Sequence, residues 1–170
     1  MKKIFYLFIA LSFYNVNAQG KLYIQNYTNY DIIGRIFSRG NSVCYPAVWG
    51  SYKLPANGQV AFEEYNKSGG FIDTWYVKTT ANGTIIPQLL NSPPPPNALT
   101  TFSSMTQWQY SWFRTEDSNG NPTGDDFWMG DDQFSSPCGV SNVNGFQAGN
   151  FSQAFWFYLP TQNETYIIVQ

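Results

Sequence analysis

The sequence Gln-Trp-Gln-Tyr-Ser-Trp at residues 107–112 decides the fold, because polar and aromatic residues alternate in it without a break. Successive side chains of a β-strand point to opposite faces, so this order predicts a strand over residues 106–114. It also predicts that Trp108, Tyr110 and Trp112 form one line on a single face. That line is either the inward face of a strand in a β-sandwich or a surface on which sugar rings and other flat ligands stack.

Short alternating segments separated by turn-forming residues continue this pattern along the chain. Between two of these segments, Asn82-Gly83 tolerates the positive φ of a type I′ turn and predicts a β-hairpin. The further predicted strands span residues 21–26, 31–38, 58–65, 73–80, 84–90, 125–130, 153–160 and 165–170. With about nine to eleven strands and no predicted helix, we expect an all-β protein, an antiparallel β-sandwich or a jelly-roll-like fold.

The first 18 residues have the pattern of a secretory signal peptide. Lys2 and Lys3 precede an apolar run over residues 4–13, and Val16 and Ala18 supply the small residues of a cleavage site before Gln19. The apolar run is shorter than the roughly 20 residues that a membrane span needs. We therefore expect residues 19–170 to form a single domain that is secreted to the extracellular space or the periplasm, with no transmembrane span.

Four consecutive prolines interrupt the strand pattern within residues 92–97. Proline cannot donate a hydrogen bond to a sheet and favours a stiff polyproline II conformation. We interpret this segment as a surface crossover between two sheets, since neither flank is long enough for a comfortable domain of its own.

The two cysteines, Cys44 and Cys138, are expected to form a disulfide, because export exposes them to an oxidising compartment. The chain contains no histidine, which removes the commonest general base and the commonest metal ligand. We therefore expect no cofactor, no metal centre of the zinc type and no Ser-His or Cys-His nucleophile.

Charged residues make up only 12% of the chain, and they are unevenly distributed. Removal of the leader would leave seven basic residues, the last of which is Arg114. All the charged residues within 115–170 are acidic. A nucleic-acid partner needs a basic footprint, so nucleic-acid binding is not expected. The low charge suits a neutral ligand better than a charged one.

The acidic segment over residues 116–126 is expected to be a solvated hairpin loop, because Asn, Gly, Asp and Pro are turn formers. Its spacing of oxygen-bearing residues resembles the start of an EF-hand, but Pro122 and Trp128 stand where that motif needs Gly and Glu. A looser calcium site is the alternative, and it would draw on Asp125, Asp126, Asp131 and Asp132.

Carboxylates are the remaining candidates for catalysis, since a glycosidase needs only two of them. The candidates are Glu63, Glu64, Glu116 and Asp125. Nothing in the sequence indicates that any of the four is buried enough to have a shifted pKa. A glycan hydrolase is therefore the less favoured alternative, and we do not expect an enzyme.

The aromatic content of 19% exceeds what one small core readily absorbs, and Trp and Tyr are enriched at binding surfaces. We expect a secreted, non-enzymatic module that binds a glycan or another cell-surface component through Trp108, Tyr110, Trp112 and Trp128. The alternative is a surface-assembly subunit or a toxin-like membrane-active protein, because residues 155–159 are apolar on both faces. The sequence leaves the oligomeric state open. The solvent exposure of the six tryptophans distinguishes the two interpretations, because exposed rings favour a binding surface and buried rings favour a core.

Overall fold

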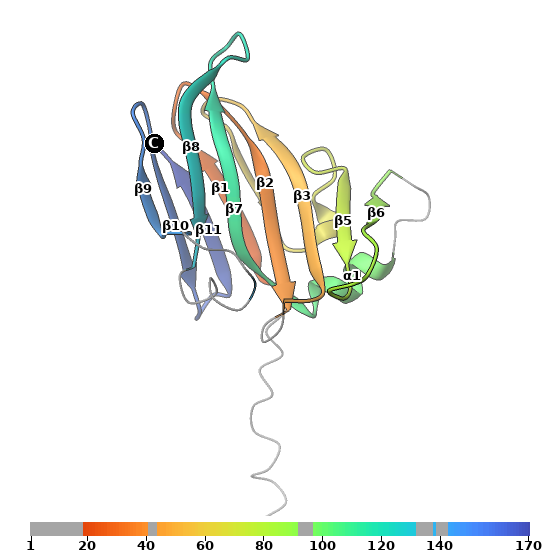
Figure 1. Cartoon of the computed structure of the whole chain (residues 1–170). Coiled ribbons are helices and arrows are strands. Elements are labelled where there is room, and N and C mark those ends of the chain that lie inside the picture. Colours follow the sequence, from red (N-terminus) through yellow and green to blue (C-terminus); the bar gives the residue numbers. More distant parts are fainter. Residues whose placement is uncertain (1–18, 41–43, 92–96, 132–137, 139–142) are drawn as a thin grey trace, which may run out of the picture.

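The computed structural model describes residues 19–40, 44–91, 97–131, 138 and 143–170, and these residues form two mostly antiparallel sheets packed face to face (Figure 1). The described part of the chain contains eleven strands. The all-β sandwich expected from the sequence is therefore confirmed. Residues 1–18 and 92–96 lie outside the described residues, so the structure does not test the signal peptide or the proline crossover.

The larger sheet has six antiparallel strands in the order β6-β5-β3-β2-β7-β8. These are β2 (Asp31–Gly40), β3 (Ala47–Leu54), β5 (Thr74–Lys78), β6 (Ile86–Leu89), β7 (Thr106–Glu116) and β8 (Pro122–Gly130). The long strands β2 and β7 lie side by side in its middle, where they pair over residues 31–40 and 106–116.

The smaller sheet has five strands in the order β4-β1-β11-β10-β9. These are β1 (Lys21–Asn26), β4 (Gln59–Phe62), β9 (Phe146–Ala148), β10 (Gln153–Leu159) and β11 (Glu164–Val169). β1 and β11 run parallel, and the other pairs in this sheet are antiparallel. The final hairpin predicted from the sequence is thus present as β10 and β11.

The two sheets approach each other at the edge formed by β8 and β9. Asn144, just before β9, donates its backbone N–H to the carbonyl of Trp128 over 3.2 Å and accepts a bond from Gly130 over 3.2 Å. Two short helices, η1 (Tyr65–Lys67) and α1 (Asn97–Ser103), complete the described elements. Figure 1 places α1 beneath β5 and β6.

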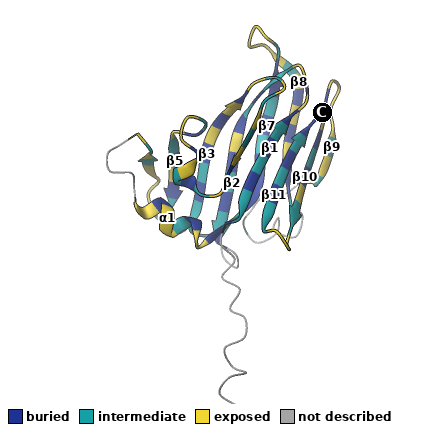
Figure 2. Cartoon of the chain, turned by 180° about the vertical axis from the view of Figure 1, so that it is seen from behind, coloured by how far each residue is buried: buried dark blue, intermediate teal, exposed yellow. Residues whose placement is uncertain are grey.

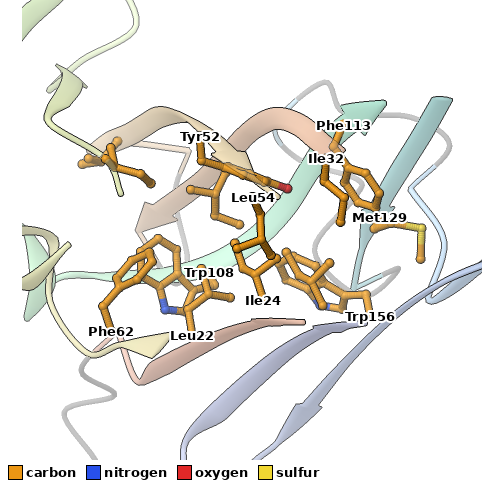
Figure 3. Close-up of a cluster of buried hydrophobic side chains, with 14 of the residues drawn as sticks. Leu22, Ile24, Ile32, Tyr52, Leu54, Phe62, Trp108, Phe113, Met129 and Trp156 are labelled. Atoms are coloured by element: carbon orange, nitrogen blue, oxygen red, sulfur yellow. The ribbon is translucent and has the colours of Figure 1, made fainter. Parts of the chain in front are cut away.

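The core between the sheets is built from apolar residues that alternate with less buried ones along the strands (Figures 2 and 3). Trp108 belongs to this core, where its ring meets those of Phe62, Tyr65 and Trp75 at centroid distances between 5.5 and 6.0 Å. Its indole N–H donates to the carbonyl of Gly20 over 3.1 Å, so the polar atom of this core residue is satisfied.

A β-bulge in β7 separates Trp108 from the other two rings of the aromatic stretch. Phe37 pairs with Tyr110, but the next residue of β2, Ser38, pairs with Trp108, so Gln109 is the extra residue. Such an insertion reverses the alternation of side chains. Trp108 therefore faces the core, whereas Tyr110 and Trp112 face outward, and the prediction of one line of three rings is wrong.

Gly130 on β8 makes room for this bulge. It pairs with Tyr110, and a Cβ atom on Gly130 would lie 2.6 Å from the carbonyl oxygen of Gln109. A side chain here would push β8 away from the bulge, so glycine is required by the close approach of the two backbones.

Three local predictions need correction. The strands flanking Asn82-Gly83 do pair as β5 and β6, but neither of these two residues has a positive φ, so the connection is not a type I′ turn. Strand β3 and helix α1 were not predicted. β3 was missed although its residues alternate and turn formers flank it, Pro46 before it and Pro55–Gly58 after it. α1 is a single short segment rich in Thr and Ser, which carries little helical signal.

The predicted disulfide between Cys44 and Cys138 is confirmed, with the two Cα atoms 5.2 Å apart across 94 residues of sequence. It joins the segment between β2 and β3 to the chain after β8. A disulfide is consistent with an oxidising, extracellular environment.

Replacement of the Trp108 ring tests this account of the core. Trp108→Ala is expected to lower the free energy of unfolding by about 3–5 kcal/mol, because it empties a buried aromatic site. Trp128→Ala is the control, since Trp128 is 43% exposed, and it should cost about 0.5 kcal/mol or less. Urea unfolding of the two variants measures both values, and equal losses would contradict the inward orientation of Trp108.

Candidate ligand-binding face

Four aromatic rings form a row on the outer face of the six-stranded sheet. They are contributed by four neighbouring strands: Tyr76 from β5, Trp49 from β3, Phe37 from β2 and Tyr110 from β7. The ring centroids lie 5.9 Å apart for Tyr76 and Trp49, 6.4 Å for Trp49 and Phe37, and 4.3 Å for Phe37 and Tyr110. All three pairs are close to parallel, with interplanar angles between 9° and 21°. We call these four residues the aromatic row.

Strand register produces the aromatic row. Trp49 is the direct cross-strand partner of Tyr76, and Phe37 is the partner of Trp49 on one side and of Tyr110 on the other. Rings on directly opposed residues meet across a sheet and stabilise it. The bulge in β7 is what brings Tyr110, rather than Gln109, opposite Phe37.

The Trp49 indole lies in the middle of the row and is not covered by a close stack. At 4.3 Å, Phe37 and Tyr110 cover each other. Trp49 is more widely separated from both of its neighbours, by 5.9 and 6.4 Å, distances well beyond the about 4.5 Å of a close offset stack. Trp49 is also half-buried rather than fully enclosed, so a planar or sugar-like ligand can reach it.

A hollow of about 390 Å³ lies over this part of the row, within the size range of ligand pockets. Its base is formed by Phe37, Trp49 and Tyr110. Its rim is formed by Tyr45, by the Cys44–Cys138 disulfide and by the cationic side chains of Arg39 and Lys78. The hollow therefore combines an aromatic base with two positive charges.

Arg39 is held in place at the rim. Its guanidinium donates to the carbonyl oxygen of Cys138 over 2.8 Å and to the hydroxyl of Tyr110 over 3.3 Å. It also lies 5.5 Å from the centre of the Tyr110 ring, a cation–π contact. Burial raises the pKa of Tyr110, although the charge and hydrogen bond of Arg39 oppose that effect. The disulfide therefore helps to position Arg39, because it fixes Cys138, whose carbonyl oxygen accepts the hydrogen bond from the guanidinium.

Lys78 supplies the second cation from β5. Its Nζ atom lies 5.8 Å from the centre of the Tyr45 ring, on the opposite side of Trp49 from Arg39 in strand order. Among the described ion pairs, none involves Arg35, Arg39 or Lys78.

A second aromatic pair extends the face toward β8. Trp112 and Trp128 are direct cross-strand partners with centroids 6.2 Å apart, and Trp128 is 43% exposed. Arg35 stands opposite Trp112 on β2. Because two residues along a strand advance by about 7 Å, the pair lies beside the aromatic row on the same face.

Three of the four residues proposed from the sequence as ligand-binding therefore lie on one face. Tyr110, Trp112 and Trp128 are on the outer face, where Tyr110 is only 7% exposed, whereas Trp108 is 3% exposed and belongs to the core. Sequence reasoning missed Phe37, Trp49 and Tyr76. The alternation Arg-Ile-Phe-Ser-Arg over residues 35–39 contained the signal for Phe37, but its relation to Trp49 depends on a strand that was not predicted.

A larger hollow, about 500 Å³, lies at the end of the sandwich near Gln19, Glu64 and Glu164. Its lining contains no aromatic residue. It lacks the flat surfaces that the hollow over Trp49 offers, and we do not assign it as the site.

The carboxylates considered for catalysis are engaged in structural contacts. Glu116 is buried and accepts two hydrogen bonds from the guanidinium of Arg114, and Lys67 lies 3.4 Å from Glu63 and 3.3 Å from Glu64. Asp125 accepts bonds from the backbone N–H groups of Asn150 and Phe151 and from the Ser152 hydroxyl. Asp125 thereby holds the β9–β10 turn.

Burial alone would raise the pKa of Asp125, but its hydrogen bonds outweigh burial and lower the pKa below the ordinary value of 3.8. A general acid of a glycosidase needs the opposite shift. Asp125 is therefore a poor candidate for that role.

The hairpin predicted for the acidic segment is present, but its turn is shorter than predicted: residues 117–121 form the turn, and residues 122–126 belong to β8. Asp117 accepts bonds from the backbone N–H groups of Asn119 and Asn121, both over 2.8 Å, which lowers the pKa of Asp117. Asp125 is buried and Asp126 is exposed on β8, so the two side chains diverge. Within the described residues no group of three acidic or cysteine side chains could hold a metal ion; Asp132 lies outside them.

Comparison of the chain with protein-family models, with curated proteins and with solved structures found no match. Among the described residues there is no helix with the length and apolar character of a membrane span.

Substitution of Asp125 tests its structural role. Asp125→Asn is expected to lower the free energy of unfolding at neutral pH by about 1.5–3 kcal/mol, because the carboxylate accepts several hydrogen bonds. The folded-state pKa is depressed, so this stabilisation is full above about pH 4 and is lost as the pH falls through the folded-state pKa. Unfolding curves of wild type and Asp125→Asn should therefore converge in acid. Asp126→Asn is the exposed control and should match wild type throughout.

Proposed function

We propose that this protein is a secreted, non-enzymatic module that binds an acidic glycan on the outer face of its six-stranded sheet. The observation that carries the proposal is the hollow in which the Trp49 indole lies between Arg39 and Lys78. The apolar C–H face of a sugar ring stacks on an indole, and a carboxylate or sulfate on the sugar pairs with the two cations. Trp112 and Trp128 offer a second stacking position for a neighbouring sugar.

The distribution of charge supports an acidic ligand and revises the expectation of a neutral one. Five of the seven basic residues after the leader project from the outer face of the six-stranded sheet: Arg35, Arg39, Lys53, Lys78 and Arg114. Two of them are compensated, Lys53 by Asp31 and Arg114 by Glu116. The other three leave a local positive charge on a chain that is acidic as a whole.

Binding to soluble polysaccharides tests this function. Wild type is expected to bind a polyuronate such as polygalacturonate more tightly than a neutral glucan, with affinity that falls as salt is raised. Trp49→Ala should weaken binding to the polyuronate by roughly tenfold or more, as expected for loss of a central aromatic contact. Lys78→Gln should reduce the preference for the acidic polymer while leaving any binding to the glucan unchanged. Isothermal titration calorimetry measures all of these.

Matched controls come from other parts of the fold. Phe157→Ala removes an exposed ring from the five-stranded sheet, and Lys67→Gln removes an exposed cation from η1. Neither should alter binding. No binding to any charged or neutral polysaccharide, or an equal effect of Phe157→Ala and Trp49→Ala, would contradict the proposed site.

A second candidate function is association through the outer face of the five-stranded sheet. Tyr23, Tyr166 and Phe157 stack across β1, β11 and β10 at 4.5 and 5.0 Å, and Phe146 and Phe155 lie beside them with centroids 5.0 Å apart. Phe157 is 39% exposed and Phe146 is 52% exposed. An apolar face of this kind favours contact with another copy of the chain or with a lipid surface.

Size-exclusion chromatography and a vesicle-leakage assay test the second candidate. If the face acts in association, the protein elutes as an oligomer or releases dye from liposomes, and Phe146→Ser with Phe157→Ser abolishes the effect. A monomer that leaves liposomes intact would remove this candidate and would not affect the glycan proposal.

A further inference from the structure

Cations lie on both sides of the aromatic row. On β2 the outward residues follow the order Arg35, Phe37 and Arg39, so the ring of Phe37 stands between two arginines. Two residues along a strand advance by about 7 Å, and each arginine is therefore displaced from the row by about that distance, in opposite directions. Arg35 is exposed and lies outside the hollow over Trp49.

Each side of the row continues onto the neighbouring strands. On one side Ala47 stands between Arg39 and Lys78, because it is the cross-strand partner of both. On the other side Arg35 is the cross-strand partner of Trp112. The row therefore runs across the strands with two cations along one side and a third cation along the other.

The row is long compared with a single sugar. Three strand spacings separate its terminal residues, Tyr76 and Tyr110, which corresponds to about 14 Å and covers several sugars. The same line continues to Pro87, the partner of Tyr76 on β6, and to Gly130, the partner of Tyr110 on β8. Pro87 is short and exposed and Gly130 has no side chain, so neither of these two residues closes an end of the row.

We propose that this face binds an internal segment of a linear, cellulose-like polyuronate that crosses the strands at right angles and lies along the aromatic row. Such a polymer is a flat ribbon in which each sugar is turned over relative to the last, so its carboxylates point alternately to opposite edges. One edge faces Arg39 and Lys78, and the other edge faces Arg35. The inference rests on the proposed function and adds the shape and direction of the polymer.

The ribbon matches the chemistry of the row and of its two sides. Its flat faces present the apolar C–H groups that pack on aromatic rings, and its edges present the negative charges that guanidinium and ammonium groups bind. A polymer with anions on a single edge would engage Arg39 and Lys78 but not Arg35. A short sugar with one anion would fill only the hollow over Trp49.

Binding of glucuronate oligomers that have the linkage of cellulose tests the direction of the polymer. Calorimetric titration should give an affinity that rises by at least about tenfold from the disaccharide to the hexasaccharide, because the longer oligomer reaches more of the row. Reduction of the terminal sugar of the hexasaccharide to an alditol should leave its affinity unchanged, since an internal segment is bound. Equal affinity for both lengths, or loss of binding on reduction, would overturn the proposal.

Substitution of Arg35 tests the second edge of the ribbon. Arg35→Gln should weaken binding of the hexasaccharide by roughly fivefold or more and should make the affinity less sensitive to salt. Lys53→Gln is the matched control, because it removes the same charge from the same face at an exposed residue that pairs with Asp31 and is four residues from Trp49 along β3. This control should bind as wild type does, and an equal effect of the two substitutions would contradict the role of Arg35.

The outcomes separate this inference from the function on which it rests. If wild type binds neither polymers nor oligomers of uronic acids, both are wrong. If it binds them but neither length nor Arg35→Gln matters, the acidic-glycan function stands and the ribbon arrangement is wrong. Tighter binding of a single-stranded oligothymidylate with the same number of charges would also overturn the inference, because the row would then prefer a nucleic acid.

Discussion

The β-bulge in β7 determines both what fills the core and what covers the outer face of the larger sheet. With Gln109 inserted between them, Trp108 turns inward while Tyr110 and Trp112 turn outward. Without it, strict alternation would send Trp108 to the same face as Tyr110, and the core would lose one of its three buried indoles. Gly130 permits the bulge, because any side chain there would meet the backbone of Gln109.

Much of this fold follows from local sequence, and the bulge shows where local sequence is insufficient. Strand β1 was predicted with its observed bounds, because Lys21–Asn26 alternates regularly and is followed by turn formers. The bulge was not predicted, because the stretch over residues 107–112 alternates without a break. An insertion is defined only by pairing with a neighbour, here Ser38 and Phe37 of β2. The same reason explains the aromatic row: Phe37, Trp49 and Tyr76 are far apart in sequence, and only strand register brings them together.

The two outer faces of the sandwich differ in chemistry although both are aromatic. The face of the six-stranded sheet combines rings with Arg35, Arg39 and Lys78, and the disulfide helps to build its hollow. The strands of the five-stranded sheet contain two charged residues, Lys21 and Glu164, which are cross-strand partners at one end. The proposed selection of a ligand by charge therefore rests on the first face, and the proposed apolar association rests on the second. The basic residues, which all precede residue 115 in the mature sequence, thus lie mainly on the outer face of the six-stranded sheet.

Oxidative labelling of the six tryptophans, read by mass spectrometry residue by residue, tests the central claim most directly. The claim is that the bulge divides the aromatic residues between a closed core and an open binding face. Trp49, Trp112 and Trp128 should be labelled, whereas Trp75, Trp108 and Trp156 should be protected, and an acidic polysaccharide should protect Trp49. Labelling of Trp108 as strong as that of Trp112 would contradict the bulge, and a Trp49 that stays fully labelled in the presence of bound polysaccharide would contradict the site.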